Sequence, residues 1–368
     1  FISKLIEGSY PDYQKVFPSG DEQKLVVEKT LVQTALNRAS VLSNEKYRGV
    51  KFILEPDNLK ICANNPSKES AEEEVPVKYK GDSFEIGFNI SYVQDSLAVI
   101  SKKDVDFELG DVNDIDLVIA VSSHADLNYP AVAIEIQNEL GIDGYAYDML
   151  VGCSSTTFAI NNAYSDIASG LADTILVVNP EISTPAVNFG KRDIHFIFGD
   201  GCVASVIKRN SSSEKTFKIL DRKLMTQFSN NIRSDWSYLA RTATDHKTSD
   251  DLIFNQNGSS VFKEVCPLVA KFISEQLEKN NIKPEDISKF WLHQANARMI
   301  NLIVSKVIGS DDFDTSLAPL PIETFGNLAS AGSLFSFNLN NDLKSGEKGI
   351  ICSFGAGYSV CSILVEKV

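Results

Sequence analysis

From residue 115 to residue 179, unbroken apolar runs alternate with segments of helical periodicity. The apolar runs cover residues 116–123, 145–150 and 173–179, and the helical segments between them cover residues 131–140 and 155–172. Strands buried on both faces read as continuous apolar runs, whereas strands with one wet face alternate apolar and polar residues. The pattern therefore predicts an α/β fold in which helices cover both faces of a sheet.

A second series of strands and helices follows a long predicted strand at residues 196–208, which Gly199-Asp200-Gly201 interrupts. We expect strands at residues 217–224, 289–293, 349–354 and 359–366, and helices at residues 258–279, 296–308 and 330–343. The two series are approximate repeats of one βαβ theme. The sequence thus predicts two halves, residues 111–210 and 211–368, of which the first lacks its opening strand and helix.

Residues 1–110 follow a different pattern, in which short strands alternate with two amphipathic helices. The first helix is predicted at residues 28–42, where apolar residues recur at helical spacing. Turn dipeptides such as Pro56-Asp57 separate predicted strands at residues 50–54, 59–64, 74–79 and 83–87, and a second helix is expected at residues 90–100. This segment is predicted to be a separate α+β domain.

The charge balance argues against a nucleic-acid-binding chain. Its 35 Lys and Arg stand against 49 Asp and Glu, a net charge of -14, and no basic run stands out. Residues 1–110 hold 14 basic and 18 acidic residues, so this domain also lacks the positive charge that binds phosphates. No apolar stretch reaches the ~18–20 residues that cross a bilayer. We therefore expect a cytoplasmic protein with no membrane and no nucleic-acid partner.

The cysteines form no CxxC pair, which favours a reducing cytoplasm and no metal site. Five of them are expected to be small buried side chains: Cys62, Cys202, Cys266, Cys352 and Cys361. Cys153 differs, because a predicted strand ends just before it and a predicted helix begins just after it. Free N–H groups and the helix dipole favour a thiolate there. We therefore expect a lowered thiol pKa and a nucleophile at Cys153.

His293 and Asn327 are the candidate partners of this thiol. His293 ends a predicted buried strand, and Asn327 follows Gly326 in a turn. Two neutral donors on a thioester oxygen stabilise an enolate when carbon dioxide leaves, so no strong base is required. The three residues indicate a condensing enzyme, although papain-like hydrolases use the same residue types. The other histidines are expected to be structural: His124, His195 and His246.

The segment Phe354-Gly355-Ala356-Gly357-Tyr358 joins the last two predicted strands. Its glycines allow close approach of the backbone, so the N–H groups of Ala356 and Gly357 are candidates for an oxyanion hole. A plain tight hairpin explains the same glycines. Gly199-Asp200-Gly201 is expected to be structural, because an aspartate in a glycine-flanked turn organises the local backbone.

In combination, residues 111–368 resemble the β-ketoacyl-acyl-carrier-protein synthase III family. Five ordered motifs carry the resemblance: Gly152-Cys153, Phe198-Gly199-Asp200-Gly201, His293-Gln294-Ala295-Asn296, Gly326-Asn327 with Ser330-Ala331-Gly332-Ser333, and Phe354-Gly355-Ala356-Gly357. The resemblance implies a thiolase-like layered α/β fold, a homodimer and no permanently bound cofactor. It also implies that acyl-CoA acylates Cys153 and that malonyl-acyl-carrier protein then attacks with the help of His293 and Asn327. Arg298, with Asn296 beside it, occupies the position of the family's basic residue that docks the acyl-carrier protein.

Two departures from that family concern the substrate. The chain reads Cys153-Ser154-Ser155-Thr156-Thr157-Phe158 where typical members have Cys-Ala-Gly-Phe, and Ala356 replaces a glycine. These features resemble the branch associated with longer acyl primers. The family's opening strand, helix and CoA-nucleotide loop have no counterpart here. This predicts weak CoA affinity and a sheet edge without its partner, at about 1–3 kcal/mol for each unsatisfied backbone group.

Residues 1–110 instead resemble the third domain of the bacterial DNA polymerase sliding clamp. The matching segments are residues 4–8, 17–18, 42–50, 63–66 and 85–89. A clamp closes a ring around duplex DNA, which one incomplete domain of negative charge cannot do. The chain therefore resembles a fusion of a sliding-clamp-like α+β domain with a thiolase-like synthase, joined near residues 110–116. A clamp fragment fused to an inactive synthase is the alternative function.

Overall fold

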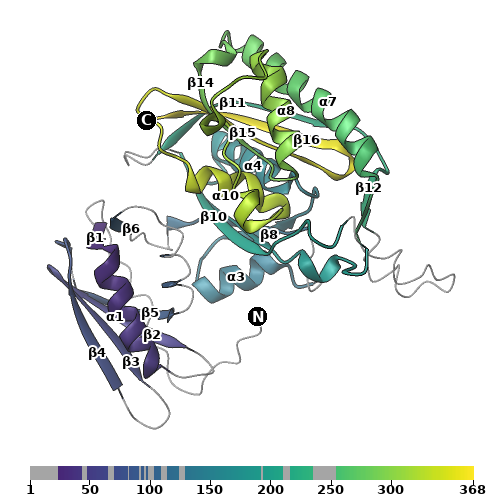
Figure 1. Ribbon diagram of the computed structural model, residues 1–368. Coiled ribbons are helices and arrows are strands. Elements are labelled where there is room, and N and C mark those ends of the chain that lie inside the picture. Colours follow the sequence, from purple (N-terminus) through teal and green to yellow (C-terminus); the bar gives the residue numbers. More distant parts are fainter. Residues whose placement is uncertain are drawn as a thin grey trace. The chain divides into compact units, whose positions relative to one another are not determined.

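The chain divides into two compact units, Phe1–Asp114 and Ile115–Val368, which Figure 1 colours along the sequence. The computed structural model describes residues 24–43, 48–64, 70–81, 83–90, 93–94, 97, 103–108, 114–123, 129–191, 194–209, 216–234 and 254–368. Parts of the predicted clamp-like segments lie outside these residues, namely residues 4–8, 17–18, 44–47 and 65–66. The expected division of the second unit near residue 210 stays a prediction.

The first unit contains an antiparallel sheet of order β4-β3-β2-β5, against which one helix packs. These elements are α1 (Lys29–Val41), β2 (Gly49–Glu55), β3 (Asn58–Asn64), β4 (Ser70–Pro76) and β5 (Phe84–Asn89). Val32 and Leu36 of the helix and Phe52 and Ile61 of the sheet share one buried core. The predicted helix and strands are confirmed. β4 begins earlier than expected because its residues Glu72–Glu74 suit an edge strand and hide the apolar signal.

The sequence patterns did not predict two short strands of the first unit. β1 (Lys24–Glu28) and β6 (Asp104–Glu108) pair with each other in antiparallel register. Each has charged residues at both ends, so its apolar pattern is too short to indicate a strand. Of the helix expected at residues 90–100, the described residues Ile90, Val93, Gln94 and Leu97 are helical, and the others lie outside the described part of the chain.

The second unit contains two four-stranded sheets layered with helices (Figure 1). It also contains a two-stranded antiparallel sheet of β12 (Ile232–Ser234) and β13 (Phe254–Gln256). The first sheet has the order β10-β9-β7-β8 and the second has the order β11-β16-β15-β14. The strands are β7 (Leu117–Val121), β8 (Tyr145–Met149), β9 (Thr174–Glu181), β10 (Gly201–Lys208), β11 (Phe217–Thr226), β14 (Ile287–Leu292), β15 (Lys348–Gly355) and β16 (Ser359–Lys367). The main helices are α3 (Val132–Leu140), α4 (Ser155–Ser169), α7 (Gly258–Lys279), α8 (Ala297–Ile308) and α10 (Gly332–Leu339). The predicted layered α/β architecture is confirmed.

Helix α4 packs between the two sheets. Ala159 and Ala163 join the buried core of the first sheet, whereas Ile160 joins Trp291 and Ile363 in a core that includes the second sheet. Helix α3 contacts the first sheet, and α7 and α8 share a core with the second sheet. The residues just before α4 therefore lie where elements of both sheets meet.

The first sheet is continuous despite the missing opening strand. β7 pairs in parallel with β8 on one side and with β9 on the other. Its residues Leu117–Val121 are all buried, and Leu117–Ala120 pair with both neighbours. The expectation of an unpaired sheet edge is therefore wrong, because direct pairing of β7 with β9 takes the place of an intervening strand.

Strand β10 begins later than expected, at Gly201 rather than at residue 196. Phe198 instead forms a bridge with Asn327, outside the sheet. Asp200 accepts hydrogen bonds from the backbone N–H groups of Ser183 (2.8 Å) and Thr184 (2.9 Å). These contacts confirm that this aspartate organises the local backbone.

Helix α10 is shorter than the helix expected at residues 330–343. The 3-10 turn η6 (Ala329–Ala331) precedes it, and it ends at Leu339. Asn340 forms the C-cap, where its side-chain Nδ2 donates to the Ser336 carbonyl (3.0 Å). Asparagine and aspartate are poor helix formers, so Asn340, Asn341 and Asp342 end the helix.

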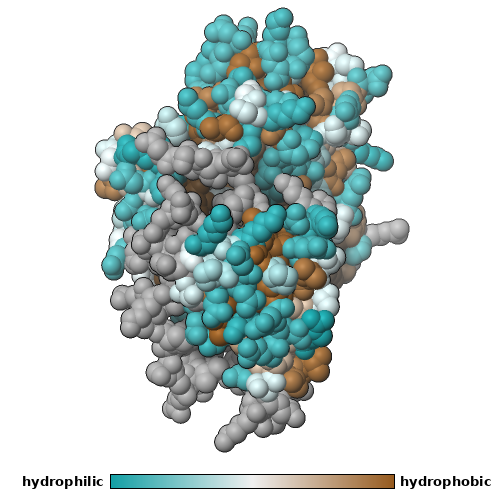
Figure 2. All heavy atoms as spheres, turned by 90° about the vertical axis from the view of Figure 1, so that its left-hand side faces the viewer, coloured by the Kyte–Doolittle hydropathy of each residue, from teal (hydrophilic) through white to brown (hydrophobic). Residues whose placement is uncertain are grey.

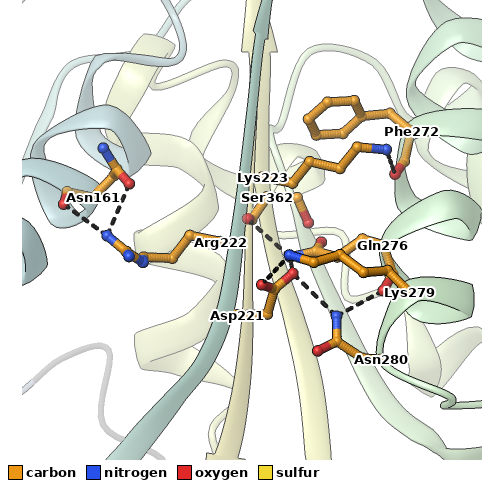
Figure 3. Close-up of polar contacts among 9 residues, drawn as sticks. All are labelled: Asn161, Asp221, Arg222, Lys223, Phe272, Gln276, Lys279, Asn280 and Ser362. Carbon is orange, nitrogen blue, oxygen red and sulfur yellow. Dashed lines mark hydrogen bonds and ion pairs between the residues drawn. The ribbon is translucent and has the colours of Figure 1, made fainter.

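Strand β11 holds helices on both of its faces through charged side chains (Figure 3). On one face, Arg222 donates from Nη1 to the backbone oxygen (3.2 Å) and side-chain oxygen (3.0 Å) of Asn161 in α4. The Arg222 guanidinium also lies 3.6 Å from the ring centroid of Tyr164. On the opposite face, Asp221 and Lys223 point toward α7. The strand therefore fixes α4, and with it the residues that precede α4.

Replacing Asp221 with alanine is expected to lower the free energy of unfolding by roughly 2 kcal/mol. Its carboxylate accepts hydrogen bonds from the end of α7: Gln276 Nε2 (3.2 Å), Lys279 Nζ (2.7 Å) and Asn280 Nδ2 (3.0 Å). Loss of the carboxylate leaves these donors without their shared acceptor. Urea unfolding of the variant and the wild type measures the difference.

The control for this variant is Asp173→Ala, which removes an exposed ion pair with Arg209. Exposed pairs contribute about 0–1 kcal/mol, so little change is expected there. An equal loss of unfolding free energy in the two variants would contradict the prediction that Asp221 stabilises the end of α7.

Hydrophilic and hydrophobic residues are interspersed over the face that Figure 2 presents. Among the residues that the structure describes, no helix is both long enough and apolar enough to span a membrane. Nor do three His, Cys, Asp or Glu side chains in this part of the chain gather as metal ligands would.

Candidate active site

Cys153 lies in a tight turn between β8 and α4. Gly152, just before it, has a φ of +60°, a left-handed conformation that favours glycine. The Ser155 side chain fixes the turn, because its Oγ accepts from the Val151 N–H (2.6 Å) and donates to the Gly152 carbonyl (2.7 Å). Ser154 is the N-cap residue of α4. The thiol therefore lies just before the helix, as the sequence predicts.

The turn between β15 and β16 packs directly against Cys153. A Cβ added to Gly355 would lie 2.5 Å from the Cβ of Cys153, so the absent side chain permits the contact. The backbone N–H of Ala356 hydrogen-bonds to the Cys153 thiol. Gly357 follows in the same turn with a φ of +68°. Both candidate oxyanion residues thus belong to the turn that covers the thiol, and their role as oxyanion donors stays a prediction.

His293 is buried immediately after β14. Its backbone N–H donates to the Cys352 carbonyl of β15 (2.8 Å). Its ring meets the Phe354 ring edge-on, with 5.3 Å between the ring centroids. Ala329 forms a backbone hydrogen bond with the imidazole, and no described residue bonds Nδ1. Because Phe354 precedes Gly355, these contacts link the imidazole to the turn that covers Cys153.

Asn327 follows the short helix α9 (Ile322–Phe325) and the left-handed Gly326. Its backbone is anchored on both sides, since its N–H donates to the Ile197 carbonyl (2.9 Å) and its carbonyl accepts from the Gly199 N–H (3.1 Å). The side-chain Oδ1 accepts from the Ala329 N–H (2.9 Å). Ala329 thus contacts both His293 and Asn327.

The pKa values of the two titratable groups differ from the sequence-based expectation. Burial, together with the charge of Glu181, raises the pKa of the Cys153 thiol to about 12, although the Ala356 N–H acts in the opposite direction. The expected lowered thiol pKa is therefore wrong, because burial outweighs the donors at the helix start. Burial also lowers the pKa of His293 to about 4. At neutral pH the Cys153 thiol is therefore protonated and the His293 imidazole is neutral.

The sequence patterns missed Glu181 altogether. It ends β9 and is fully buried, and its charge acts on Cys153. In the sequence, Glu181 is a carboxylate at the end of an apolar run. Polar residues are common at the ends of strands, so this position did not indicate a functional residue.

Asn296 and Arg298 lie at the exposed start of α8. Asn296 is the N-cap residue, and its side-chain oxygen accepts from the Arg298 N–H (2.8 Å). This contact explains the local structure of the two residues. Their role in docking a carrier protein stays a prediction.

Among the residues that the structure describes, the remaining cysteines and His195 have structural surroundings with one exception. Cys266, Cys352 and Cys361 are buried, as expected, and Cys62 is partly buried, whereas Cys202 is exposed. The expectation for Cys202 is wrong because every second residue of the edge strand β10 is exposed. The His195 ring Nδ1 lies 3.2 Å from the Lys191 carbonyl oxygen. Two expected structural histidines lie outside the described residues: His124 and His246.

The buried imidazole predicts an acid-sensitive fold. An unfolded histidine has a pKa near 6.5, whereas that of folded His293 is about 4. Between these values the unfolded chain binds a proton that the folded chain does not, so stability falls as the pH is lowered. The expected loss is roughly 3 kcal/mol between pH 6.5 and 4. Urea unfolding across this range should give a flatter pH dependence for His293→Gln, and an unchanged slope would contradict the prediction.

Comparison with known proteins relates most of the second unit to condensing enzymes. Residues 147–227 match the 3-oxoacyl-[acyl-carrier-protein (ACP)] synthase III family, and residues 277–367 match the C-terminal part of that family. A β-ketodecanoyl-[acyl-carrier-protein] synthase of Pseudomonas aeruginosa is 46% identical over 257 residues, which cover 69% of this chain and 73% of that protein.

Solved structures show the same fold. The 3-oxoacyl-[acyl-carrier-protein] synthase III of Aquifex aeolicus matches with a TM-score of 0.59 at 24% identity, over 69% of this chain and 78% of that one. A 3-oxoacyl-(acyl carrier protein) synthase III from Pseudomonas aeruginosa matches with a TM-score of 0.58 at 21% identity, over 68% of this chain and 76% of that one. The predicted thiolase-like fold is confirmed.

The first unit is similar to a different protein. Residues 14–131 match the C-terminal domain of the DNA polymerase III beta subunit. The beta sliding clamp of Pseudomonas aeruginosa is 48% identical over 118 residues, 32% of this chain and 32% of that protein. The chain thus spans about a third of the length of the curated clamps it matches. Two resemblances in one chain are confirmed, and the clamp match extends beyond residue 110.

Proposed function

The chain belongs to the 3-oxoacyl-[acyl-carrier-protein] synthase III family, and on that premise we propose how its residues carry out condensation. It is an acyltransferase of the β-ketoacyl-acyl-carrier-protein synthase III type. The observation that carries the proposal is the packing of Cys153 against the turn that follows Phe354. The Phe354 ring meets the buried His293, and Ala329 links His293 to Asn327. We assign the nucleophile to Cys153 and the two enolate donors to His293 and Asn327.

In the first step, the Cys153 sulfur attacks the thioester carbonyl of an acyl-CoA. A new carbon–sulfur bond forms, the bond to CoA breaks, and CoA leaves as a thiol with the proton that Cys153 gives up. Because the resting thiol is protonated, this proton has to move during the step. The N–H groups of Ala356 and Gly357 would stabilise the negative charge on the carbonyl oxygen.

In the second step, malonyl-acyl-carrier protein loses carbon dioxide. The electron pair of the broken carbon–carbon bond forms an enolate, whose oxygen receives hydrogen bonds from His293 and Asn327. The enolate carbon attacks the acyl group on Cys153, and the sulfur leaves and regains a proton. The neutral imidazole suits this role, because a donor is required rather than a strong base.

The acyl primer is proposed to be of medium length. The Pseudomonas aeruginosa relative is named for a β-ketodecanoyl product, a ten-carbon chain. A two-carbon extension gives that product from an eight-carbon primer. The Ser-Ser-Thr-Thr segment after Cys153 supports the same assignment, because it differs from the Cys-Ala-Gly-Phe motif. Octanoyl-CoA is therefore the first primer to test.

Partners and location follow from the same resemblance. The acyl-carrier protein would meet the exposed start of α8, where Arg298 offers a positive charge and Asn296 caps the helix. A cytoplasmic homodimer is proposed, and no nucleic-acid or membrane partner is required by this chemistry. Acyl-CoA and malonyl-acyl-carrier protein are substrates, and no resident cofactor enters the steps.

The test is a reaction of the whole chain with octanoyl-CoA and carboxyl-labelled malonyl-acyl-carrier protein. Labelled carbon dioxide and a β-ketodecanoyl-acyl-carrier protein, identified by mass spectrometry, are expected in equal amounts. A folded sample that gives neither would refute the assignment. Octanoate release without condensation would instead favour the Cys-His-Asn hydrolase.

The alternative is a clamp fragment fused to an inactive synthase. It is favoured only by the first unit, which matches about a third of a clamp. Binding of a clamp-recognition peptide by a chain that fails the condensation assay would support it.

A further inference from the structure

Glu181 is a buried carboxylate held by four hydrogen bonds. Its oxygens accept from the Ser123 N–H (3.0 Å) and Ser123 Oγ (3.0 Å), two residues after β7. They also accept from the Ser330 N–H (3.1 Å) and from Ser330 Oγ. No Lys or Arg in the described part of the chain forms an ion pair with Glu181. Such a charge is costly to bury, so these hydrogen bonds must fix its position.

What Glu181 holds is the turn η6. Ser330 lies in the middle of η6, next to Ala329, whose φ of +45° is unusual for a residue with a side chain. Ala329 contacts Asn327 through its N–H and His293 through a backbone hydrogen bond. A left-handed alanine persists only where its surroundings enforce it. The Ser330–Glu181 contacts supply that enforcement on one side of Ala329.

The same cluster reaches the helix that follows the thiol. Thr156 Oγ1, in the first turn of α4, donates to the Ser330 carbonyl (2.8 Å). Asn179 Nδ2 donates to the Val121 carbonyl (2.7 Å) and contacts Ser330 Oγ (3.0 Å). Ser330 is thus tied to β7, β9 and α4 together, and Glu181 is the charged member of the cluster.

We propose that Glu181 is a positioning residue of the condensing site, which holds η6 and thereby sets His293 and Asn327 in place for the acyl group on Cys153. The inference rests on the proposed function. It assigns Glu181 no contact with the substrate. Misplacement by about 1 Å can cost 100-fold in rate, so the donors need such a support.

The decisive variant is Glu181→Gln, which keeps the shape and removes the charge. A carboxylate accepts hydrogen bonds at both oxygens, whereas the glutamine amide has one accepting oxygen and one NH₂ that donates. The serine donor that faces the NH₂ therefore loses its acceptor. Malonyl decarboxylation is expected to fall on the order of 100-fold. Acylation of Cys153 by octanoyl-CoA, followed by intact mass, should persist. Glu135→Gln, on the exposed face of α3, is the matched control and should behave as the wild type.

A second readout separates positioning from general damage to the fold. The negative charge of Glu181 acts on the Cys153 thiol, so its removal should shift the pH profile of Cys153 alkylation to lower pH. Among the described residues, Glu181 is the charged side chain that acts on the thiol, and the imidazole of His293, which follows β14, is linked to the covering turn through Phe354. Tyr358 of that turn donates to Glu264 (2.6 Å). The rate is followed on the Cys153 peptide by mass spectrometry. Glu181→Asp keeps the charge and should keep the wild-type profile.

The possible outcomes are distinct. A wild type that neither acylates nor condenses refutes the proposed function, whereas the alkylation profile still tests Glu181 because it requires no turnover. Unchanged decarboxylation, or an unchanged alkylation profile in Glu181→Gln, overturns the inference. If Glu181→Gln does not fold, Ser330→Ala replaces it. That variant should lose about 10-fold in decarboxylation with acylation retained, and full activity would overturn the inference.

Discussion

Replacing Cys153 with alanine should give a folded protein that gains no mass from any acyl-CoA. The proposed acyl-enzyme needs the sulfur, and alanine offers no nucleophile. Loss of a nucleophile costs on the order of 1,000-fold in rate or more, so condensation should fall below detection. Intact-protein mass spectrometry after incubation with acyl-CoAs of increasing length measures the adduct and also reports the preferred primer.

The control for this experiment is Cys62→Ala, which alters a thiol in the first unit. It should take up the acyl group as the wild type does. An adduct that persists in Cys153→Ala and disappears in Cys62→Ala would place the nucleophile elsewhere. A residual malonyl decarboxylation in Cys153→Ala is compatible with the proposal, because His293 and Asn327 remain.

Replacing Gly355 with alanine should damage both the site and the fold. The new Cβ would lie 2.5 Å from the Cys153 Cβ and 3.0 Å from its backbone nitrogen, distances that real Cβ atoms avoid. Neither neighbour is the far end of a flexible side chain, so the β15–β16 turn or the Cys153 turn has to shift. Overpacking of this kind typically costs about 1–3 kcal/mol. Because the shift falls on the nucleophile, acylation should slow on the order of 100-fold.

Gly258→Ala is the matched control, since in the described part of the chain no atom outside its own helix backbone and chain neighbours lies within 4 Å of a Cβ added there. Gly258 begins α7, where alanine is also the better helix former. This variant should retain the wild-type stability and acylation rate. Equal effects at both positions would show that the close approach of the two turns is unimportant.

The layered architecture of the second unit could be predicted because several of its strands, such as β7 and β15, are buried on both faces. Continuous apolar runs mark β7 and β9, and the helical spacing at residues 258–279 predicts α7 with its observed ends. The position of Cys153 before α4 follows from the same patterns. These features depend on residues close together in the sequence, so the local pattern of residues predicts them.

Features that depend on distant contacts could not be predicted. The pairing of β7 with β9 is a choice among neighbours that no local pattern encodes. The raised pKa of Cys153 comes from burial and from Glu181, which is distant in sequence. The exposure of Cys202 follows from the edge position of β10. In each case the missing information is which segment lies next to which.

The direct pairing of β7 with β9 also governs how quickly the second unit can form. Parallel neighbours cannot be joined by a hairpin, so the chain between Val121 and Thr174 must cross over, and here it contains β8 and α4. Contacts between residues far apart in sequence form only after the intervening chain has closed into a loop, which costs conformational entropy. This cost slows folding. Until β7 has paired with its neighbours, its apolar residues stay exposed and can associate with other chains. This unit should therefore depend more than a helical bundle on dilution and on chaperones during its synthesis.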